Sequence, residues 1–114
     1  MALALNVYQT VTGIASTIAT VAYTAPIGYS GIVLLAQASN VGSNTQSVTL
    51  KHQRTVGITT VDTEILFDYP LPINDSSSLI QGKLVLETND SLVISASNDT
   101  DVKYIISVLE TLNQ

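Results

Sequence analysis

The sequence has 114 residues, enough for one hydrophobic core, and it has no cysteine, which excludes disulfide bonds and thiolate metal sites. Only 11% of the residues are charged, against roughly 25% in typical soluble domains, and the net charge is −5. The first 50 residues carry no Asp, Glu, Lys or Arg, and all nine acids lie between Asp62 and Glu110. Nucleic-acid binding is not expected, because phosphates require clustered cations and the four Lys and Arg residues are scattered.

The uncharged N-terminal half raises the question of a membrane segment or a signal peptide. The opening residues lack a basic segment, and no stretch approaches the ~20 apolar residues that span a bilayer. The mixture of Thr, Ser, Val and Ile is typical of strands instead. We therefore expect no membrane partner.

Residues 1–15 are predicted to be an N-terminal arm or edge strand, and residues 16–114 a single β-sandwich domain. The arm hypothesis, in which this segment packs on a neighbouring protein, follows from its apolar residues and its lack of charge. The alternative is that it forms the first strand of its own sandwich. Further strands are predicted at 18–24, 31–39, 45–54, 61–69 and 78–81, separated by Gly, Pro and Asn turn signals.

The strand over residues 31–39 is predicted to be central because both of its faces are largely apolar. Strict alternation places Ile32, Leu34, Ala36 and Ala38 on one face and Val33, Leu35, Gln37 and Ser39 on the other.

Residues 83–112 contain three apolar runs separated by TNDS and NDTD, which predicts a β-meander, since Asn and Asp tolerate left-handed turn conformations. In the middle run, alternation assigns Leu92, Ile94 and Ala96 to the core, and from the last run Tyr104 and Ile106 are added to it. The last run is apolar on both faces, which predicts a strand covered on both sides.

The fold class predicted from this pattern is all-β, an antiparallel β-sandwich of eight or nine short strands, with jelly-roll connectivity as one form of it. No helix is needed, because the longest candidate is rich in β-branched residues and lacks a cap.

The residues that carry chemistry do not form a catalytic motif. His52 is the only histidine, no acid lies beside it in the sequence, and we interpret it as a packed or hydrogen-bonded structural residue rather than a ligand or general base. No Gly-x-Ser-x-Gly motif or phosphate-binding loop occurs. We expect no enzymatic activity and no cofactor.

Asp90, Asp99 and Asp101 are weak calcium candidates, because they could supply oxygen ligands but lack the spacing of an EF-hand loop. Their ordinary interpretation is as turn residues. The five tyrosines could line a sugar-binding platform, but they are scattered and are more simply interpreted as packing residues.

Two segments resemble small structural proteins of tailed bacteriophages. They are YTAPIGYSGIVLLAQASN at residues 23–40, followed by TQSVTLKHQ, and PLPINDSSSLIQGKLVLETNDSLVISASNDTDVKYIISVLETL at residues 70–112. In that group a proline–glycine turn leads into a buried strand, and later a proline step precedes Gly-Lys-Leu-Val-Leu-Glu and an Asp-Ser turn. Thr88 stands here where a glycine is common. The resemblance implies a β-sandwich virion component of the kind that decorates capsids or builds collars, fibres and tail attachments, often as a trimer.

The resulting hypothesis is a non-enzymatic bacteriophage virion structural protein on the capsid, neck or tail, assembled in the host cytoplasm. Its expected partners are itself, as a homotrimer, and other virion proteins. The alternative is a carbohydrate-binding β-sandwich module for host adsorption, with a host-surface glycan as ligand, which would need exposed aromatic residues beside Asp or Asn at one loop end. The interface candidates are apolar residues of the first and last strands: Leu3, Leu5, Val7, Val11, Ile105 and Leu109.

Overall fold

The structure is a computed structural model that describes residues 6–113. In that range the chain forms nine strands and no helix, so that no described helix could cross a membrane. The predicted all-β class and strand number are confirmed. The strands are β1 (Asn6–Ala15), β2 (Thr20–Thr24), β3 (Tyr29–Asn40), β4 (Gln46–Val56), β5 (Thr59–Leu71), β6 (Ser76–Ser78), β7 (Leu84–Leu86), β8 (Ser91–Ala96) and β9 (Val102–Leu112).

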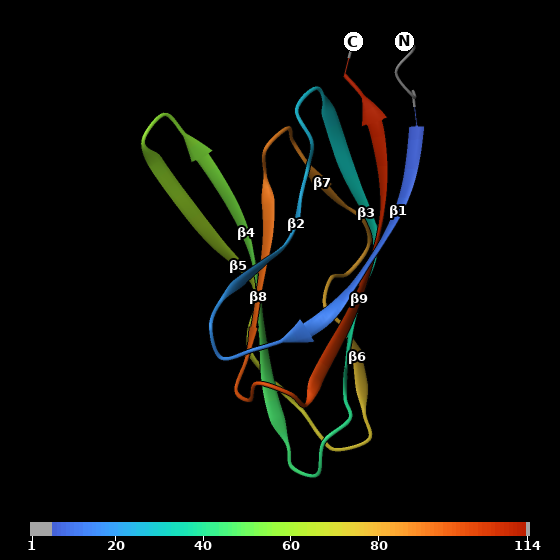
Figure 1. Cartoon of the computed structure of the whole chain (residues 1–114), viewed down its shortest axis with the longest axis vertical. Coiled ribbons are helices and arrows are strands. Elements are labelled where there is room, and N and C mark those ends of the chain that lie inside the picture. Colours follow the sequence, from blue (N-terminus) through green and yellow to red (C-terminus); the bar gives the residue numbers. More distant parts are fainter. Residues whose placement is uncertain (1–5, 114) are drawn as a thin grey trace.

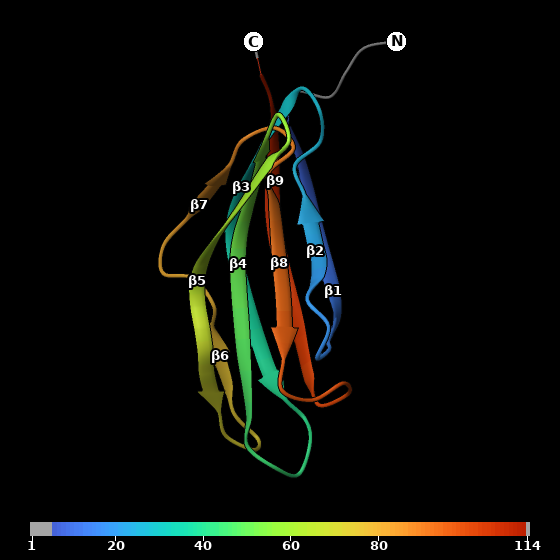
Figure 2. The ribbon, with the colours of Figure 1, turned by 90° about the vertical axis from the view of Figure 1, so that its left-hand side faces the viewer.

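The strands form two antiparallel sheets that pack face to face (Figure 1). Sheet A has the order β1-β9-β3, with β6 and β7 pairing along the far side of β3. Sheet B has the order β2-β8-β4-β5, and its four strands lie side by side in Figure 2. Apart from the β4–β5 hairpin and the β6–β7 step, each connection carries the chain to the other sheet. This is the connectivity of a jelly roll.

The meander predicted for residues 83–112 is wrong. β7 pairs with β3, β8 pairs with β2 and β4, and β9 pairs with β1 and β3, so no two of the three are partners. In the first of the two turn segments, Asn89 adopts a left-handed conformation with a φ of 69°. These turns carry the chain across the sandwich instead of reversing it within one sheet.

The core lies between the sheets and contains most of the residues expected there. Leu92, Ile94 and Ile106 are buried, whereas Ala96 and Tyr104 are partly buried and pack against the core. The middle strand of the C-terminal region therefore faces the interior as predicted. On its other face Val93 is also buried.

Strict alternation along β3 is interrupted by a bulge, which corrects the predicted faces. The register with β9 shifts between Val33 and Leu35, so that Val33 and Ala36 both face the core. Leu34 and Leu35 are 38% and 40% exposed on the outer side. A bulge places two residues opposite one, and the alternation restarts after it.

The N-terminal segment is a strand of its own sandwich, as far as the structure describes it. β1 pairs with β9 over all ten of its residues, from Asn6 opposite Thr111 to Ala15 opposite Val102. Residues 6–15 therefore match the edge-strand alternative of the prediction, because their backbone pairs within the chain. Leu3 and Leu5 lie outside the described residues.

Candidate functional site

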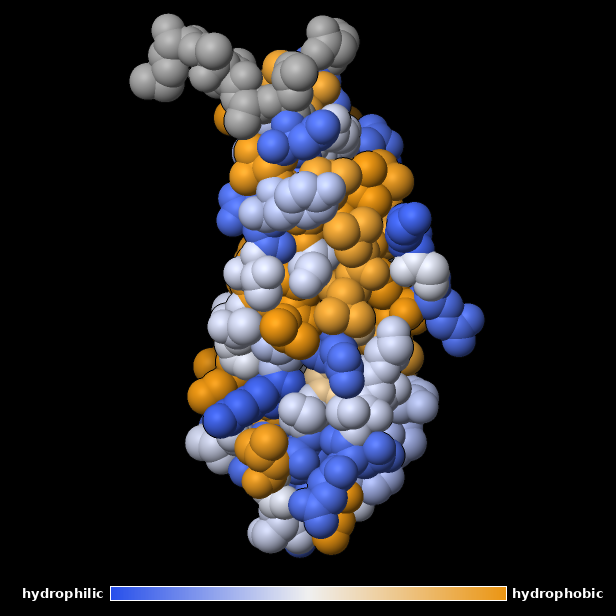
Figure 3. All heavy atoms as spheres, turned by 90° about the vertical axis from the view of Figure 1, so that its right-hand side faces the viewer, coloured by the Kyte–Doolittle hydropathy of each residue, from blue (hydrophilic) through white to orange (hydrophobic). Residues whose placement is uncertain are grey.

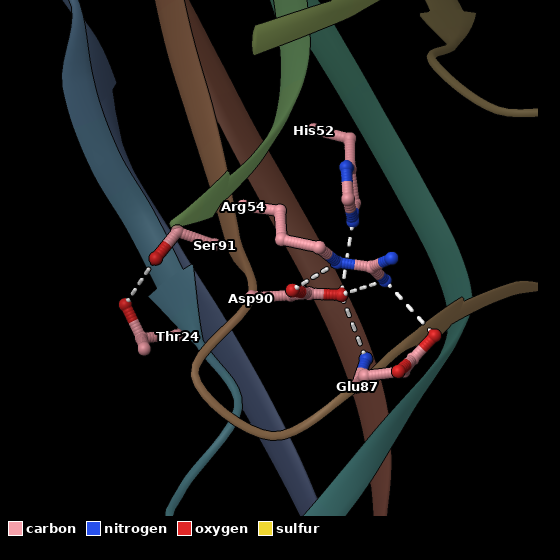
Figure 4. Close-up of polar contacts among 6 residues, drawn as sticks. All are labelled: Thr24, His52, Arg54, Glu87, Asp90 and Ser91. Atoms are coloured by element: carbon pink, nitrogen blue, oxygen red, sulfur yellow. Dashed lines mark hydrogen bonds and ion pairs between the residues drawn. The ribbon is translucent and has the colours of Figure 1, made fainter. Parts of the chain in front are cut away.

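A cluster of charged side chains surrounds Asp90, at the end of the connection between β7 and β8 (Figure 4). The Asp90 side chain is only 3% exposed. Nε of Arg54 donates to its Oδ1 at 2.9 Å, and Nη2 of Arg54 donates to its Oδ2 at 2.6 Å. Oδ2 also accepts the backbone N–H of Glu87 at 2.9 Å and lies 3.0 Å from Nε2 of His52.

The electrostatics of this cluster favour the ionised carboxylate. The two hydrogen bonds from Arg54 are the main reason why the pKa of Asp90 is lowered to about 2, with His52 and the Glu87 backbone adding to them. Burial alone would act in the opposite direction. The same contacts raise the pKa of Arg54. Arg54 also contacts the exposed carboxylate of Glu87 at 3.1 Å.

The cluster connects β4 of sheet B to the β7–β8 connection, which carries the chain from sheet A to sheet B. His52 is hydrogen-bonded, in keeping with its structural interpretation, but its partner lies 38 residues away in the sequence. Ser91, next to Asp90, shares a hydrogen bond of 2.8 Å with Thr24 and is turned away from His52 in Figure 4. The arrangement is that of a buried carboxylate paired with a partly exposed guanidinium, and it contains no activated nucleophile among the described residues.

The three calcium candidates are not brought together. Asp99 accepts the backbone N–H and the hydroxyl of Thr17 at 2.9 and 2.8 Å, and these bonds lower its pKa. Asp101 accepts from Gln46 and Thr100. The length of β8 separates both from Asp90. Within residues 6–113 no three acidic or histidine side chains meet in a metal-binding arrangement.

The outer face of sheet A carries exposed apolar side chains from several neighbouring strands. Val85 of β7 lies opposite Ile32 of β3, Ile32 opposite Leu109 of β9, and Leu109 opposite Tyr8 of β1. Directly opposed residues share a face, so these four side chains form a row across four neighbouring strands. We call it the apolar row.

Further apolar side chains extend the apolar row along the strands. They are Leu34, Leu35, Ile105 and Ile14. Figure 3, which looks onto this side of the molecule, shows a continuous hydrophobic band. Among the strand residues described in sheet A only Lys103 and Glu110 are charged, and Glu110 is buried. The outer face is therefore almost free of charge.

The interface candidates divide between the two faces of sheet A. Ile105 and Leu109 are on the outer face, with the apolar row. Val11 lies opposite the buried Ile106 and packs against the core, and Val7 lies opposite Glu110. Sequence spacing places Ile105 and Leu109 on one face of the last strand, but it could not show that residues of β3 and β7 lie beside them.

The exposed aromatic rings do not gather at one loop end. Tyr8 is on β1, whereas Phe67 and Tyr69 are on β5, and these strands are edges of different sheets. Tyr69 lines an open hollow of about 480 Å³ between β5 and the chain from β6 onward, together with Ser77, Ser78 and Gln81. Tyr23 is buried. The arrangement that a sugar platform would need is not found in the described residues.

Comparison with known proteins shows the fold. No family model matches the sequence, and no curated protein matches it. A chain from the acid-stable capsid structure of Helicobacter pylori bacteriophage KHP30 is similar, with a TM-score of 0.58 and 14% identity over 97% of this chain and 90% of that chain. A chain of the IBDV viral particle has a TM-score of 0.58 and 11% identity, over 96% of this chain and 32% of that chain. A chain of the disulfide-linked pili of Bacillus endospore appendages has a TM-score of 0.51 and 11% identity, over 95% and 88%.

Proposed function

We propose that this chain is a non-enzymatic structural protein of a virus particle and that it assembles with copies of itself. The observation that carries the proposal is the extent of the structural match. The jelly roll that spans 97% of this chain matches 90% of a chain in a bacteriophage capsid structure. In both molecules this sandwich is nearly the entire matched chain.

The outer face of sheet A supports self-assembly. Monomeric soluble proteins seldom expose contiguous apolar patches larger than a few hundred Å², and permanent interfaces are depleted of charge. Two side chains of the apolar row, Tyr8 and Val85, are more than half exposed, and the row crosses the sheet beside a single charged strand residue, Lys103. Covering this face would remove the surface that makes a lone copy prone to aggregation.

We further propose a place on the capsid, neck or tail as a decoration or fibre component. There it would form a homotrimer and contact other virion proteins, assembling in the host cytoplasm. The support is the resemblance of residues 23–53 and 70–112 to small structural proteins of tailed bacteriophages. In a trimer each copy would bury its own apolar row against a different surface of the next copy.

Two measurements test the proposal. Sedimentation velocity of the purified chain at micromolar concentration is expected to show an oligomer, and a single 12.1 kDa species would contradict self-assembly. Mass spectrometry of gradient-purified particles is expected to find the chain in many copies per particle. Its absence from particles, with abundant soluble chain in the lysate, would contradict the virion role.

A further inference from the structure

We propose that β1 is an open sheet edge on which a second copy of this chain pairs through its own β1, in antiparallel orientation, so that sheet A continues across two molecules. This inference deepens the proposed function, on which it rests, because it specifies one of the contacts through which copies assemble.

The other edges of the sandwich are protected against such pairing. A long exposed edge strand is a template for another chain, and proteins block it with charge, proline, bulges or short length. β5 carries three acids and Pro70, and its register with β4 shifts twice. β2 has five residues and a bulge between Val21 and Tyr23. β6 and β7 have three residues each.

β1 has none of these protections. Its ten residues, NVYQTVTGIA, include no charged residue and no proline. They pair with β9 in one unbroken register. β1 is the last strand of sheet A, and in the described part of the chain no strand pairs with its other side. In Figure 2 it lies at the margin of the sandwich beside β2.

Apolar side chains flank this edge on both sheets. Tyr8 and Ile14 on the outer face of β1 are 76% and 54% exposed. Ile18, in the turn after β1, is 75% exposed, and Val21 on β2 is 51% exposed. A strand added at β1 would therefore gain backbone hydrogen bonds and also cover apolar surface, the combination by which strand addition binds.

The sequence of β1 fits a second copy of itself. When two copies of β1 pair in antiparallel orientation, the residue numbers of every two opposed residues add up to the same value. This sum must be even, because inward-facing residues of one copy must lie opposite inward-facing residues of the other. The two even sums that pair the largest number of β1 residues are 20 and 22. A sum of 20 places Gln9 opposite Val11 and Asn6 opposite Ile14, so that polar side chains oppose apolar ones.

A sum of 22 places Tyr8 opposite Ile14, Thr10 opposite Thr12, and Val11 opposite itself. Aromatic with β-branched pairs and Thr with Thr pairs are among the favourable cross-strand combinations. We therefore assign the two-fold axis to Val11. Because the axis relates both copies, each favourable pair occurs twice.

A two-fold contact closes on itself and produces only a dimer. Extension into a larger assembly needs a second, different contact, and the apolar row supplies one. The two surfaces adjoin, since Tyr8 belongs to both.

Charge substitutions test the register. Thr10→Lys with Thr12→Lys places like charges directly opposite each other at two symmetry-related points, and we expect the dissociation constant of the β1 contact to rise about tenfold. Thr10→Lys with Thr12→Glu places opposite charges there and is expected to restore association to near the wild-type value. Ser43→Lys with Thr45→Lys adds the same charge to the exposed loop between β3 and β4 and serves as the control. Thermal unfolding at low concentration checks that each variant is folded.

Cross-linking supplies a second measurement, made simple by the absence of native cysteine. Directly opposed positions have Cβ atoms about 4.5–5.5 Å apart, close to disulfide range, whereas diagonal positions are about 7–8 Å apart. An equimolar mixture of Thr10→Cys and Thr12→Cys should therefore oxidise to a covalent dimer faster than either variant alone.

The outcomes separate this inference from the proposed function. If the wild-type chain forms an oligomer that the double-lysine variant leaves unchanged, β1 pairing is wrong and the virion role stands. If the mixture cross-links no faster than its components, the register centred on Val11 is wrong and the virion role stands. If the variants behave as expected but the chain is absent from particles, β1 pairing stands and the virion role is wrong.

Discussion

The phenol of Tyr23 donates a hydrogen bond of 2.5 Å to Oε2 of Glu110 and so joins β2 of sheet B to β9 of sheet A. Glu110 is only 5% exposed and accepts a second bond from Nε2 of Gln9 at 3.3 Å. Burial is the main reason why the pKa of Tyr23 is raised, and the hydrogen bond to Glu110 adds to the effect. Gly31 of β3 lies opposite Glu110 of β9, and a Cβ atom on residue 31 would come within 3.2 Å of the Tyr23 ring. Glycine at position 31 therefore leaves room for the phenol that holds the two sheets together.

Replacing Tyr23 with Phe should lower the free energy of unfolding by about 1–3 kcal/mol, because a buried carboxylate loses its shortest hydrogen bond. Urea denaturation at neutral pH measures the change. Tyr69→Phe is the matched control, since this ring is 41% exposed and lies in neither proposed association surface, and we expect less than about 0.5 kcal/mol from it. Equal effects of the two substitutions would mean that the bond between the sheets contributes nothing.

The Asp90 cluster predicts a loss of stability in acid. The pKa of Asp90 falls from its usual value of 3.8 to about 2 on folding, so the ionised form is favoured in the folded state. The associated stability, about 2 kcal/mol, is fully present above the unfolded pKa and is lost as the pH falls through the folded pKa. The free energy of unfolding of the wild-type chain should therefore decrease from about pH 5 towards pH 2.

Asp90→Asn should unfold more easily at neutral pH and should show a flatter profile between these pH values. Asp99→Asn is the control, because it removes an exposed carboxylate bound to Thr17 and leaves the Arg54 contacts in place. It should keep most of the acid-dependent loss. A wild-type slope that survives in Asp90→Asn would place its origin in other groups.

The existence of the strands could be predicted from local pattern, but their partners could not. The alternation of Leu92 and Ile94 correctly identified the inner face of β8, because period-two burial is a local property. The pairing of β7, β8 and β9 depends on whether a turn reverses the chain within one sheet or crosses to the other. The same Asn and Asp residues serve both purposes, so the meander was a reasonable but wrong prediction.

The bulge in β3 and the Asp90 cluster escaped prediction for related reasons. Leu34 and Leu35 are both apolar, and nothing in their local sequence shows where an extra residue enters the strand. The cluster joins residues 36 and 38 positions apart, and only the jelly-roll connectivity brings them together. One partial signal was available, since alternation places His52 and Arg54 on the same face of their strand.

Truncating the core at Ile94 should cost about 2–5 kcal/mol of unfolding free energy, the range observed for buried Ile to Ala changes. Ile94 is 1% exposed and lies opposite Leu50 and Thr20 in the middle of sheet B. Ile27→Ala, at a position 81% exposed, is the control and should cost less than about 0.5 kcal/mol. A loss below half a kilocalorie at Ile94 would show that β8 faces the other way.

The outer face of sheet A should lose its capacity for association when charge is placed on it. Leu35→Lys with Val85→Lys adds two cations to positions that are 40% and 57% exposed, so the isolated sandwich should tolerate them with little change in unfolding temperature. In an assembly that covers the apolar row, the same cations would be buried without partners. We expect the dissociation constant, measured by sedimentation, to rise more than about tenfold, which corresponds to about 1.4 kcal/mol.

Val56→Lys, at the 72% exposed end of the β4–β5 hairpin, is the control for a cation placed at an exposed apolar position of the other sheet. If this control weakens association as much as the paired substitution does, the hairpin is part of the interface. If neither variant weakens association, copies do not meet through the outer face of sheet A.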